Sequence, residues 1–381
     1  METNVSRGKT TVAMVLAAVL IGGGHSALAA VHESTLTIKA ARVAGELSDF
    51  VVYVDLADMD DGFWGNLTTG PGTTSIVVKN AGGISLSREI VWLEEDNHKG
   101  EMHFKAHSLS GALDTTFTVS VGGTVLTDNR NTDTWSNGYL GVWHLGEENG
   151  DHNDSTSVGT EKDGHRHDNT YEAEGKVGSA QRFDGTDDYI EIASLGGYNG
   201  SSATVSAWVR LDELPSGGQH ATVWGNYEDE NNRIYLFCSK DDRKLTAFGK
   251  NEENPPWSLP DLKSDAAMSE GAWQYVSVSL DTTAGHARLY LDDAEFGPSA
   301  YSSIVANIHE IGMVNGSHFF DGLIDEFRIS NEVRSADWIL TEYNNQSSPW
   351  AFYTVTPEPG TFAVLAAAGA LCVLLRRRRA A

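Results

Sequence analysis

The sequence is short of basic residues. It has 27 Lys and Arg against 53 Asp and Glu in 381 residues, so its formal net charge is −26. A chain this acidic repels nucleic acid and anionic lipid or polysaccharide, and we expect no nucleic-acid partner. The same composition offers many oxygen ligands for Ca²⁺.

Cysteine is too scarce for a disulfide framework or for a zinc site built from cysteine pairs. Of the two cysteines, Cys372 lies in an apolar stretch near the C-terminus. Cys238 alternates in phase with Ile234 and Leu236 in the run RIYLFCSK. This phase predicts a buried, unreactive thiol, so the fold depends on core packing and on any metal ion that it binds.

Motifs of familiar catalytic chemistry are missing as well. The chain contains no phosphate loop, no nucleophile elbow and no zincin helix. Nothing in the sequence supports catalysis, and we expect a protein that is not an enzyme.

The N-terminus has the three parts of a secretory signal. Arg7 and Lys9 give it a positive start, and residues 12–21 form a short apolar run. Ala27 and Ala29 supply the small residues that signal peptidase requires, which predicts cleavage after Ala29. A membrane anchor is the alternative, but the apolar run is short for a membrane span.

The C-terminus carries a second apolar segment. Residues 361–375 contain no charge, and as a helix they would span roughly 22 Å of a hydrocarbon core of about 30 Å. Four arginines follow, which favours a transmembrane helix with a cytoplasmic tail. Pro357 and Pro359 end any helix just before this segment.

The order PEPG, apolar helix and terminal arginine cluster resembles the PEP-CTERM sorting signal of Gram-negative bacteria. The resemblance implies recognition of Pro357, Glu358 and Pro359 by an exosortase-type transpeptidase, with Arg376, Arg377, Arg378 and Arg379 closing the signal. It also implies an inner-membrane intermediate and final placement at the cell surface or in the extracellular matrix. A plain tail anchor is the alternative.

Between the two ends, strand patterns dominate. The ends carry six basic and two acidic residues, so the body holds 21 basic and 51 acidic residues, a net charge of −30. Short runs rich in β-branched and aromatic residues alternate with Gly, Asn and Asp clusters. In the first block they fall at 48–56, 74–80, 89–95, 100–109 and 115–123, and they predict a small β-sandwich.

The second block, from 138 to 348, has nine or more evenly spaced strand patterns and predicts two packed antiparallel sheets, a jelly roll. One helical pattern follows at 335–345. Ser335 is placed to cap it, and Trp338, Ile339 and Tyr343 are placed to form its apolar face.

Six separated motifs in the second block are VWHLGEE, FDGTDDYIEI, SAWVRLDE, WQYVSVSLD, ARLYLDD and FDGLIDEFRISNEVRSADWI. In this order they resemble bacterial laminin-G-like, concanavalin A-like jelly rolls. The preceding stretch, with GFWGNL, REIVW, HSLSG and NGYLGVWHLGE, resembles a bacterial β-domain of unknown function that commonly precedes such jelly rolls. The first resemblance implies binding of glycan or protein.

Some concanavalin A-like proteins are glucanases that set carboxylates along one strand as Glu-x-Asp-x-x-Glu. The run EEDNHK at 94–99 has Lys99 where the last Glu should stand. The run YEDENNR at 227–233 has Glu228 and Glu230 in phase but no third carboxylate. A glycoside hydrolase or lyase therefore remains an alternative without a supporting motif.

In GLIDEFRIS, strand alternation puts Asp325 on the same face as Leu323, Phe327 and Ile329. A carboxylate among apolar side chains must be paired or must bind a metal ion. The alternative is that Asp325 caps a turn or accepts backbone N–H groups.

Two acidic turns supply partners for Asp325, namely Asp154 in NDST and Asp168 in RHDNT. We expect the three aspartates to bind one structural Ca²⁺, as jelly rolls of the kind that this sequence resembles often do. His165 and His167 lack an evident third ligand, so we expect a solvated loop there.

Sugar binding needs aromatic rings with polar neighbours. Trp257, in the proline-rich run NEENPPWSLPD, and Tyr227, beside an acidic loop, are the candidate ligand-binding residues. Trp224 flanks the same acidic loop, but we expect it to plug the end of the sandwich. Three tryptophans within strand motifs are expected in the core: Trp143, Trp208 and Trp273.

The sequence thus predicts an exported, non-catalytic, all-β surface protein that binds a polysaccharide or a surface protein; a purely structural matrix component is the alternative. The expected divisions are a signal peptide (1–29), a β-sandwich (30–137), a jelly roll (138–348), a linker (349–356) and a sorting signal (357–381) with a transmembrane helix (361–375).

Overall fold

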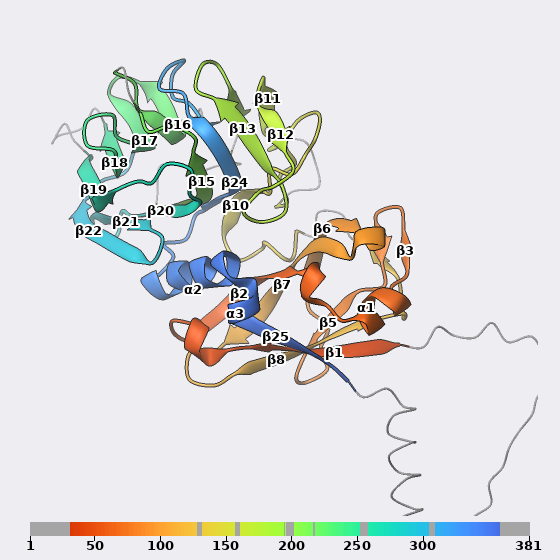
Figure 1. The fold of residues 1–381 in the computed structure, drawn as a ribbon. Helices are drawn as coiled ribbons and strands as arrows, with labels where there is room; N and C mark the ends of the chain where they lie inside the picture. The colour runs from red at the N-terminus through yellow and green to blue at the C-terminus, as the bar shows by residue number, and fades with distance from the viewer. Residues whose placement is uncertain are drawn as a thin grey trace, which may run out of the picture.

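The computed structural model describes residues 31–127, 132–156, 161–193, 195, 202–215, 218–251, 258–304 and 309–358. Two β-domains adjoin one another, as Figure 1 shows. The predicted signal peptide and the apolar segment 361–375 lie outside the described residues. Within the described part of the chain, no helix is both long and apolar enough to cross a membrane.

The first domain contains two facing β-sheets and a small third sheet. The orders are β25-β1-β8-β5, β2-β7-β6 and β3-β4-β9. The strands are β1 (His32–Ile38), β2 (Leu47–Asp55), β3 (Thr69–Gly70), β4 (Thr73–Thr74), β5 (Val77–Asn80), β6 (Arg88–Glu94), β7 (Lys99–Leu109), β8 (Thr115–Val121), β9 (Leu126–Thr127) and β25 (Tyr353–Pro357). The short helix α1 (Asp61–Asn66) and 3-10 turns at Ala40–Arg42, Leu56–Asp58 and Glu95–Asn97 connect them.

The five strand runs expected in this domain correspond to β2, β5, β6, β7 and β8. In β8 the alternation of polar and apolar residues holds, because Phe117, Val119 and Val121 are all buried. The ring of Phe117 meets Phe104 of β7 edge-on, with the ring centroids 4.9 Å apart. The core therefore lies between the two larger sheets, as the period of two predicts.

Strand β25 comes from the C-terminal end of the chain and completes the first domain. It pairs antiparallel with β1 from Ser34–Pro357 to Ile38–Tyr353. Residues 349–356, expected to be a linker, instead form α3 (Pro349–Phe352) and most of β25. The second domain is therefore inserted between the last internal strand of the first domain and its final strand.

The second domain is a sandwich of two antiparallel sheets. One sheet has the order β11-β14-β23-β16-β17-β18-β19, and the other has the order β12-β13-β24-β15-β20-β21-β22 with β10 also paired to β24. The strands are β10 (Tyr139–Trp143), β11 (His165–His167), β12 (Thr170–Glu172), β13 (Ala180–Asp184), β14 (Tyr189–Ile192), β15 (Ala203–Leu211), β16 (Ala221–Asp229), β17 (Asn232–Cys238), β18 (Lys244–Lys250), β19 (Leu259–Ala267), β20 (Gln274–Asp281), β21 (His286–Leu291), β22 (Ala294–Ala300), β23 (His309–Ile311) and β24 (Asp321–Ser330).

The core of the second domain confirms the expected phase of β17. Ile234, Leu236 and Cys238 all pack into it, together with Trp143 and Trp224. Burial raises the pKa of the Cys238 thiol to about 12, so the thiol stays protonated and unreactive at neutral pH. Trp208, also expected in the core, is buried on the outer face of the other sheet instead.

A β-bulge in β24 changes the predicted phase of Asp325. Ser206 pairs with Arg328 and Trp208 pairs with Asp325, so β24 has one residue more than β15 over this stretch. Glu326 has a left-handed backbone there, with φ of 51°. Ile324, rather than Leu323, therefore joins Phe327 and Ile329 in the main core.

Helix α2 (Ala336–Ser347) lies between the two domains (Figure 1). Ser335 caps it as predicted, by accepting a hydrogen bond of 3.2 Å from the Trp338 N–H. The expected single apolar face divides in two. Trp338 packs into the core of the first domain, whereas Ile339 and Tyr343 pack against Trp208 and Tyr275 of the second.

Three buried polar side chains of α2 also bond to the two domains. Asn345 accepts a hydrogen bond from the Tyr53 N–H (2.7 Å) and donates one to the Tyr53 carbonyl (2.9 Å). Gln346 accepts from the Trp208 indole at 2.7 Å. Glu342 accepts from the Tyr275 hydroxyl at 2.6 Å and pairs with Arg328.

We predict that Tyr353→Ala destabilises the first domain by about 3 kcal/mol or more, because Tyr353 is 1% exposed and its ring fills the core. Its hydroxyl also donates a hydrogen bond of 2.9 Å to Asp58. Urea denaturation followed by circular dichroism measures the loss. The control is Trp350→Ala, whose side chain is 73% exposed and which should change stability by less than about 0.5 kcal/mol. Equal stability of the two variants would show that β25 is dispensable.

Candidate functional site

Asp154, expected to bind Ca²⁺, is fully buried and bonded to protein groups. Its Oδ1 accepts from the backbone N–H of Val142 (2.9 Å) and of Thr156 (3.0 Å). Its Oδ2 accepts from the Thr156 hydroxyl at 2.7 Å. Both oxygens therefore hold the turn that follows β10.

Asp325 accepts backbone N–H groups, which is the alternative that the sequence left open. Its Oδ2 accepts from Lys176 at 2.7 Å and from Val177 at 2.8 Å. Its Oδ1 is buried and has no hydrogen-bond partner within the described structure. Burial and the neighbouring Glu326 raise the pKa of this carboxyl well above its ordinary value.

Asp168 lies in an exposed turn between β11 and β12, with a left-handed backbone at φ of 60°. Among the described residues, two groups of at least three acidic or histidine side chains are close enough to share an ion: Glu101, His103, His144 and Glu326, and Asp184, Asp187 and Asp188. Neither group contains Asp154, Asp168 or Asp325. A Ca²⁺ site on those three aspartates stays a prediction.

The expected ligand-binding residues have different outcomes. Trp257 lies outside the described residues. Tyr227 is half-buried on β16 and lines a hollow of about 210 Å³ with Arg233 and Tyr235. Trp224, expected to plug the end of the sandwich, is buried in the core of the jelly roll.

The hollow beside Tyr227 adjoins a second one of about 260 Å³, and Tyr235, Val314 and His318 line both. We call the combined hollow the sheet groove. It lies on the outer face of β16 to β19, because Tyr235 and Phe237 alternate with the core residues Leu236 and Cys238.

Aromatic rings form the floor of the sheet groove. Tyr235 on β17 pairs with Phe248 on β18, with ring centroids 6.2 Å apart. The Arg233 guanidinium lies 5.9 Å from the centre of the Tyr235 ring. Phe237 contacts His220 at 4.5 Å between ring centroids. Such a floor presents flat apolar faces beside polar groups.

Two histidines line the sheet groove, His220 and His318. The Nδ1 of His220 accepts from the Lys240 N–H, and the Nδ1 of His318 accepts from the His220 N–H, each at 3.1 Å. A neutral imidazole whose Nδ1 accepts carries its proton on Nε2. Burial, His318 and Lys240 lower the pKa of His220 to about 4, and burial and Lys240 also lower that of His318. Both rings are therefore neutral Nε2–H donors at pH 7.

Charged side chains border the sheet groove at β19. Lys263 pairs with Asp242 at 3.0 Å and with Asp261 at 3.4 Å. Together with Asp241, Lys263 and Asp261 line the larger hollow. Acceptors, donors and rings thus surround one shallow surface, which suits a ligand with many hydroxyl groups.

Sequence reasoning missed Tyr235, Phe248 and both histidines of the sheet groove. The run RIYLFCSK did contain a usable signal, because the phase that buries Cys238 turns Tyr235 and Phe237 outward. His318 could not be found in this way, since the loop after β23 brings it beside His220 from 98 residues away.

Comparison with known proteins gives the class of the second domain. Residues 184–340 match the family model Laminin_G_3, described as the concanavalin A-like lectin/glucanases superfamily. The second domain is therefore a laminin-G-like, concanavalin A-like jelly roll, as the sequence motifs implied. No curated protein matches the chain.

Several solved structures are similar to part of the chain at low identity. Domain 4 of AbnA, a GH43 extracellular arabinanase from Geobacillus stearothermophilus solved with arabinotriose, is 21% identical with a TM-score of 0.44, covering 54% of this chain and 98% of that one. A Trypanosoma rangeli sialidase is 13% identical (TM-score 0.42), covering 54% of this chain and 32% of that one. The receptor binding domain of botulinum neurotoxin D is 14% identical (TM-score 0.44), covering 55% and 53%. The chain thus spans about a third of the sialidase and about half of the neurotoxin domain.

We predict that His220 holds its proton on Nε2 at pH 7 and titrates with a midpoint near pH 4. Long-range ¹H–¹⁵N NMR reports both properties, and His220→Gln assigns the signal. In His318→Gln the midpoint should rise part of the way towards the ordinary value of about 6.5, because the neighbouring ring contributes but burial contributes more. A wild-type midpoint near 6.5 would contradict the described environment.

Proposed function

We propose that the protein is an exported, non-catalytic binding protein whose jelly roll holds a neutral polysaccharide in the sheet groove. The observation that carries this proposal is the groove itself, with Tyr235 and Phe248 as a floor and His220 and His318 as neutral donors. Aromatic faces pack on sugar rings, while nearby donors and acceptors bond the hydroxyl groups.

The net charge of the chain restricts the class of ligand. A net charge of −26 repels uronic acids, sulfated glycans and other polyanions. The groove is also shallow and open at both hollows, which suits an internal stretch of a chain rather than a small enclosed molecule. The ligand class is therefore an uncharged polysaccharide.

We predict that Tyr235→Ala weakens binding to the preferred neutral polysaccharide at least tenfold, or about 1.4 kcal/mol, as loss of a central aromatic anchor does. Isothermal titration of the full-length chain against a panel of soluble neutral and acidic glycans measures the change. Tyr235→Phe keeps the ring and should retain most of the affinity.

Trp350→Ala is the matched control, because it removes an exposed aromatic ring from the first domain. Equal binding by Tyr235→Ala and wild type would reject the sheet groove as the site. Absence of binding to every glycan would favour a structural matrix component. Release of reducing ends from the bound glycan would favour the hydrolase alternative.

Export and sorting are the second part of the proposal. The chain would leave the cytoplasm on residues 1–29, halt in the inner membrane on residues 361–375 and be released by an exosortase-type enzyme at Pro357–Glu358–Pro359. Support comes from the order of these segments in the sequence. In the folded chain the Glu358 N–H bonds the Glu33 carbonyl at 2.9 Å and its side chain accepts from the Thr35 hydroxyl, so the motif begins at the end of β25.

We predict that replacing all three residues of Pro357–Glu358–Pro359 by alanine leaves the unprocessed chain in the inner-membrane fraction of a Gram-negative host with this sorting system. Membrane fractionation and the mass of the chain measure the outcome. Thr35→Ala is the control, since it removes the side-chain contact of Glu358 but leaves the motif intact. Normal release of the alanine variant would show that the motif is not needed for processing, whereas retention of the wild type in the membrane would favour a plain tail anchor.

A further inference from the structure

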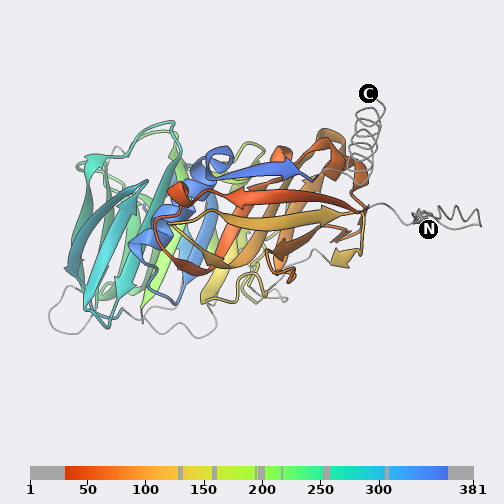
Figure 2. The ribbon, with the colours of Figure 1, turned by 90° about the horizontal axis from the view of Figure 1, so that it is seen from below.

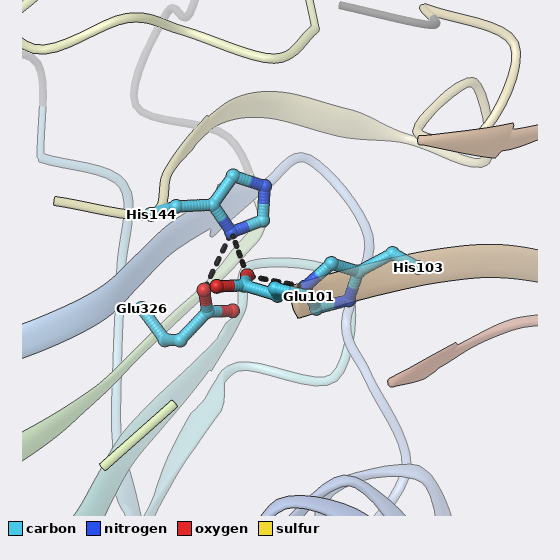
Figure 3. Close-up of side chains that lie close together, drawn as sticks. All are labelled: Glu101, His103, His144 and Glu326. Carbon is cyan, nitrogen blue, oxygen red and sulfur yellow. Dashed lines mark hydrogen bonds and ion pairs between the residues drawn. The ribbon is translucent and has the colours of Figure 1, made fainter. Parts of the chain in front are cut away.

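A cluster of ionisable side chains lies buried where the two domains meet. Glu101 and His103 come from β7 of the first domain, while His144 follows β10 and Glu326 lies on β24 of the second. Figure 3 shows the four side chains pointing towards one another. All four are buried, and His103 is fully so.

One atom of each side chain faces a common centre. The His103 Nε2 lies 2.9 Å from the Glu101 Oε1, and the His144 Nδ1 lies 3.3 Å from the same oxygen. The His144 Nδ1 also lies 2.5 Å from the Glu326 Oε1. The four atoms are all within 4.8 Å of one another.

The remaining polar atoms of three of these side chains face other partners. The Glu101 Oε2 accepts from the Trp92 indole at 3.0 Å, and the Glu326 Oε2 pairs with Arg328. The His144 Nε2 points towards Glu89, 3.6 Å from its Oε2. In metal sites, the second nitrogen of a histidine ligand commonly bonds a carboxylate, and the second oxygen of a carboxylate ligand commonly accepts a hydrogen bond. Such contacts orient the metal ligands.

The charges of the cluster do not balance. Glu89, Glu101, Glu326 and Glu342 are each at most 5% exposed. Among the described residues paired with them, Arg328 is the one side chain with a permanent positive charge. Burying several carboxylates against one guanidinium is costly, so a bound cation or bound protons must offset the excess negative charge.

We propose that Glu101, His103, His144 and Glu326 bind one divalent transition-metal ion, with Zn²⁺ the best fit. Two imidazole nitrogens and two carboxylate oxygens form a four-ligand set that suits zinc. Bonds of about 2.0–2.1 Å in a tetrahedron separate neighbouring ligand atoms by about 3.3 Å. The separations of 2.5, 2.9 and 3.3 Å lie within 1 Å of this value, and all four atoms lie within 4.8 Å of one another, so modest shifts of the side chains would complete the tetrahedron.

A proton on His144 is the rival source of positive charge. Burial opposes it, but the carboxylate of Glu326 raises the pKa of His144 well above its ordinary value. A proton supplies one charge and forms no bond to His103. A divalent ion supplies two charges and is bonded by both histidines.

The ion would join the two domains, because each domain supplies one histidine and one glutamate. It would add a direct bond between β7 and β24 to the contacts that α2 makes. Since no ligand is exposed, the ion enters during folding or domain closure and exchanges slowly afterwards. This inference does not depend on glycan binding by the sheet groove.

The test begins with the wild-type full-length chain. The chain is unfolded in urea with EDTA, refolded with Zn²⁺, Co²⁺ or Ca²⁺, and freed of loose ions on a desalting column. We expect about one Zn²⁺ or Co²⁺ per chain by mass spectrometry of the metal. Co²⁺ should give the visible absorption of a tetrahedral site, and Zn²⁺ should raise the melting temperature.

Variants locate the ion. His103→Gln and His144→Gln should each lower the bound Zn²⁺ from about one to below 0.2 per chain after the same refolding. His165→Gln is the matched control, because His165 is exposed and pairs with Asp151. It should bind as the wild type does.

Failure of the wild type to retain Zn²⁺ or Co²⁺ would overturn the proposal whatever the variants do. If His103→Gln and His144→Gln both retain the metal and His165→Gln loses it, the ion lies on the surface. That result would also overturn the proposal. If His103→Gln or His144→Gln does not fold, the Co²⁺ spectrum of the wild type still tests the proposal. A tetrahedral spectrum supports the four-ligand site, and an octahedral spectrum contradicts it. Retention of Ca²⁺ alone would favour the aspartate site instead.

Discussion

Burial of polar side chains around helix α2 is the constraint on which the arrangement of the two domains depends. Asn345 bonds both backbone groups of Tyr53, as a neighbouring strand would, while Gln346 and Glu342 bond the second domain. Separating the domains would expose these groups to water, but shifting them while they stay buried would leave donors and acceptors unpaired. Each such group costs about 1–3 kcal/mol. The interface therefore permits one orientation.

Local patterns in the sequence predict most of the strands, because burial on one face requires a period of two and capping requires specific side chains. They fail where the partner is distant. The run YTVTP, at the start of the tail, alternates weakly and ends in proline, so it resembles a linker until β1, more than 300 residues earlier, pairs with it. Proline is tolerated there because β25 is an edge strand. The bulge at Glu326 could not be predicted from local patterns either, because it depends on the pairing of β24 with β15.

The candidate sites divide in the same way. Tyr227 could be found from the sequence, and the alternation of β17 places Tyr235 on the outer face of the sheet. Alternation does not show, however, which outer face carries a groove. The buried cluster contains one local signal, because Glu101 and His103 are two residues apart on one strand and share a face. His144 and Glu326 are separated by 182 residues and meet only when the jelly roll folds and docks.

The sheet groove and the C-terminal end of β25 lie at opposite ends of the molecule. The sheet that contains β24 and β15 faces α2 and the first domain, so the outer face of β16 to β19 points away from both. Figures 1 and 2 show the described chain leaving β25 at the far end of the first domain. A tail held in or near a membrane would thus leave the groove directed outward. A rigid interface preserves this direction, because a flexible joint would let the jelly roll fold back towards the surface that carries it.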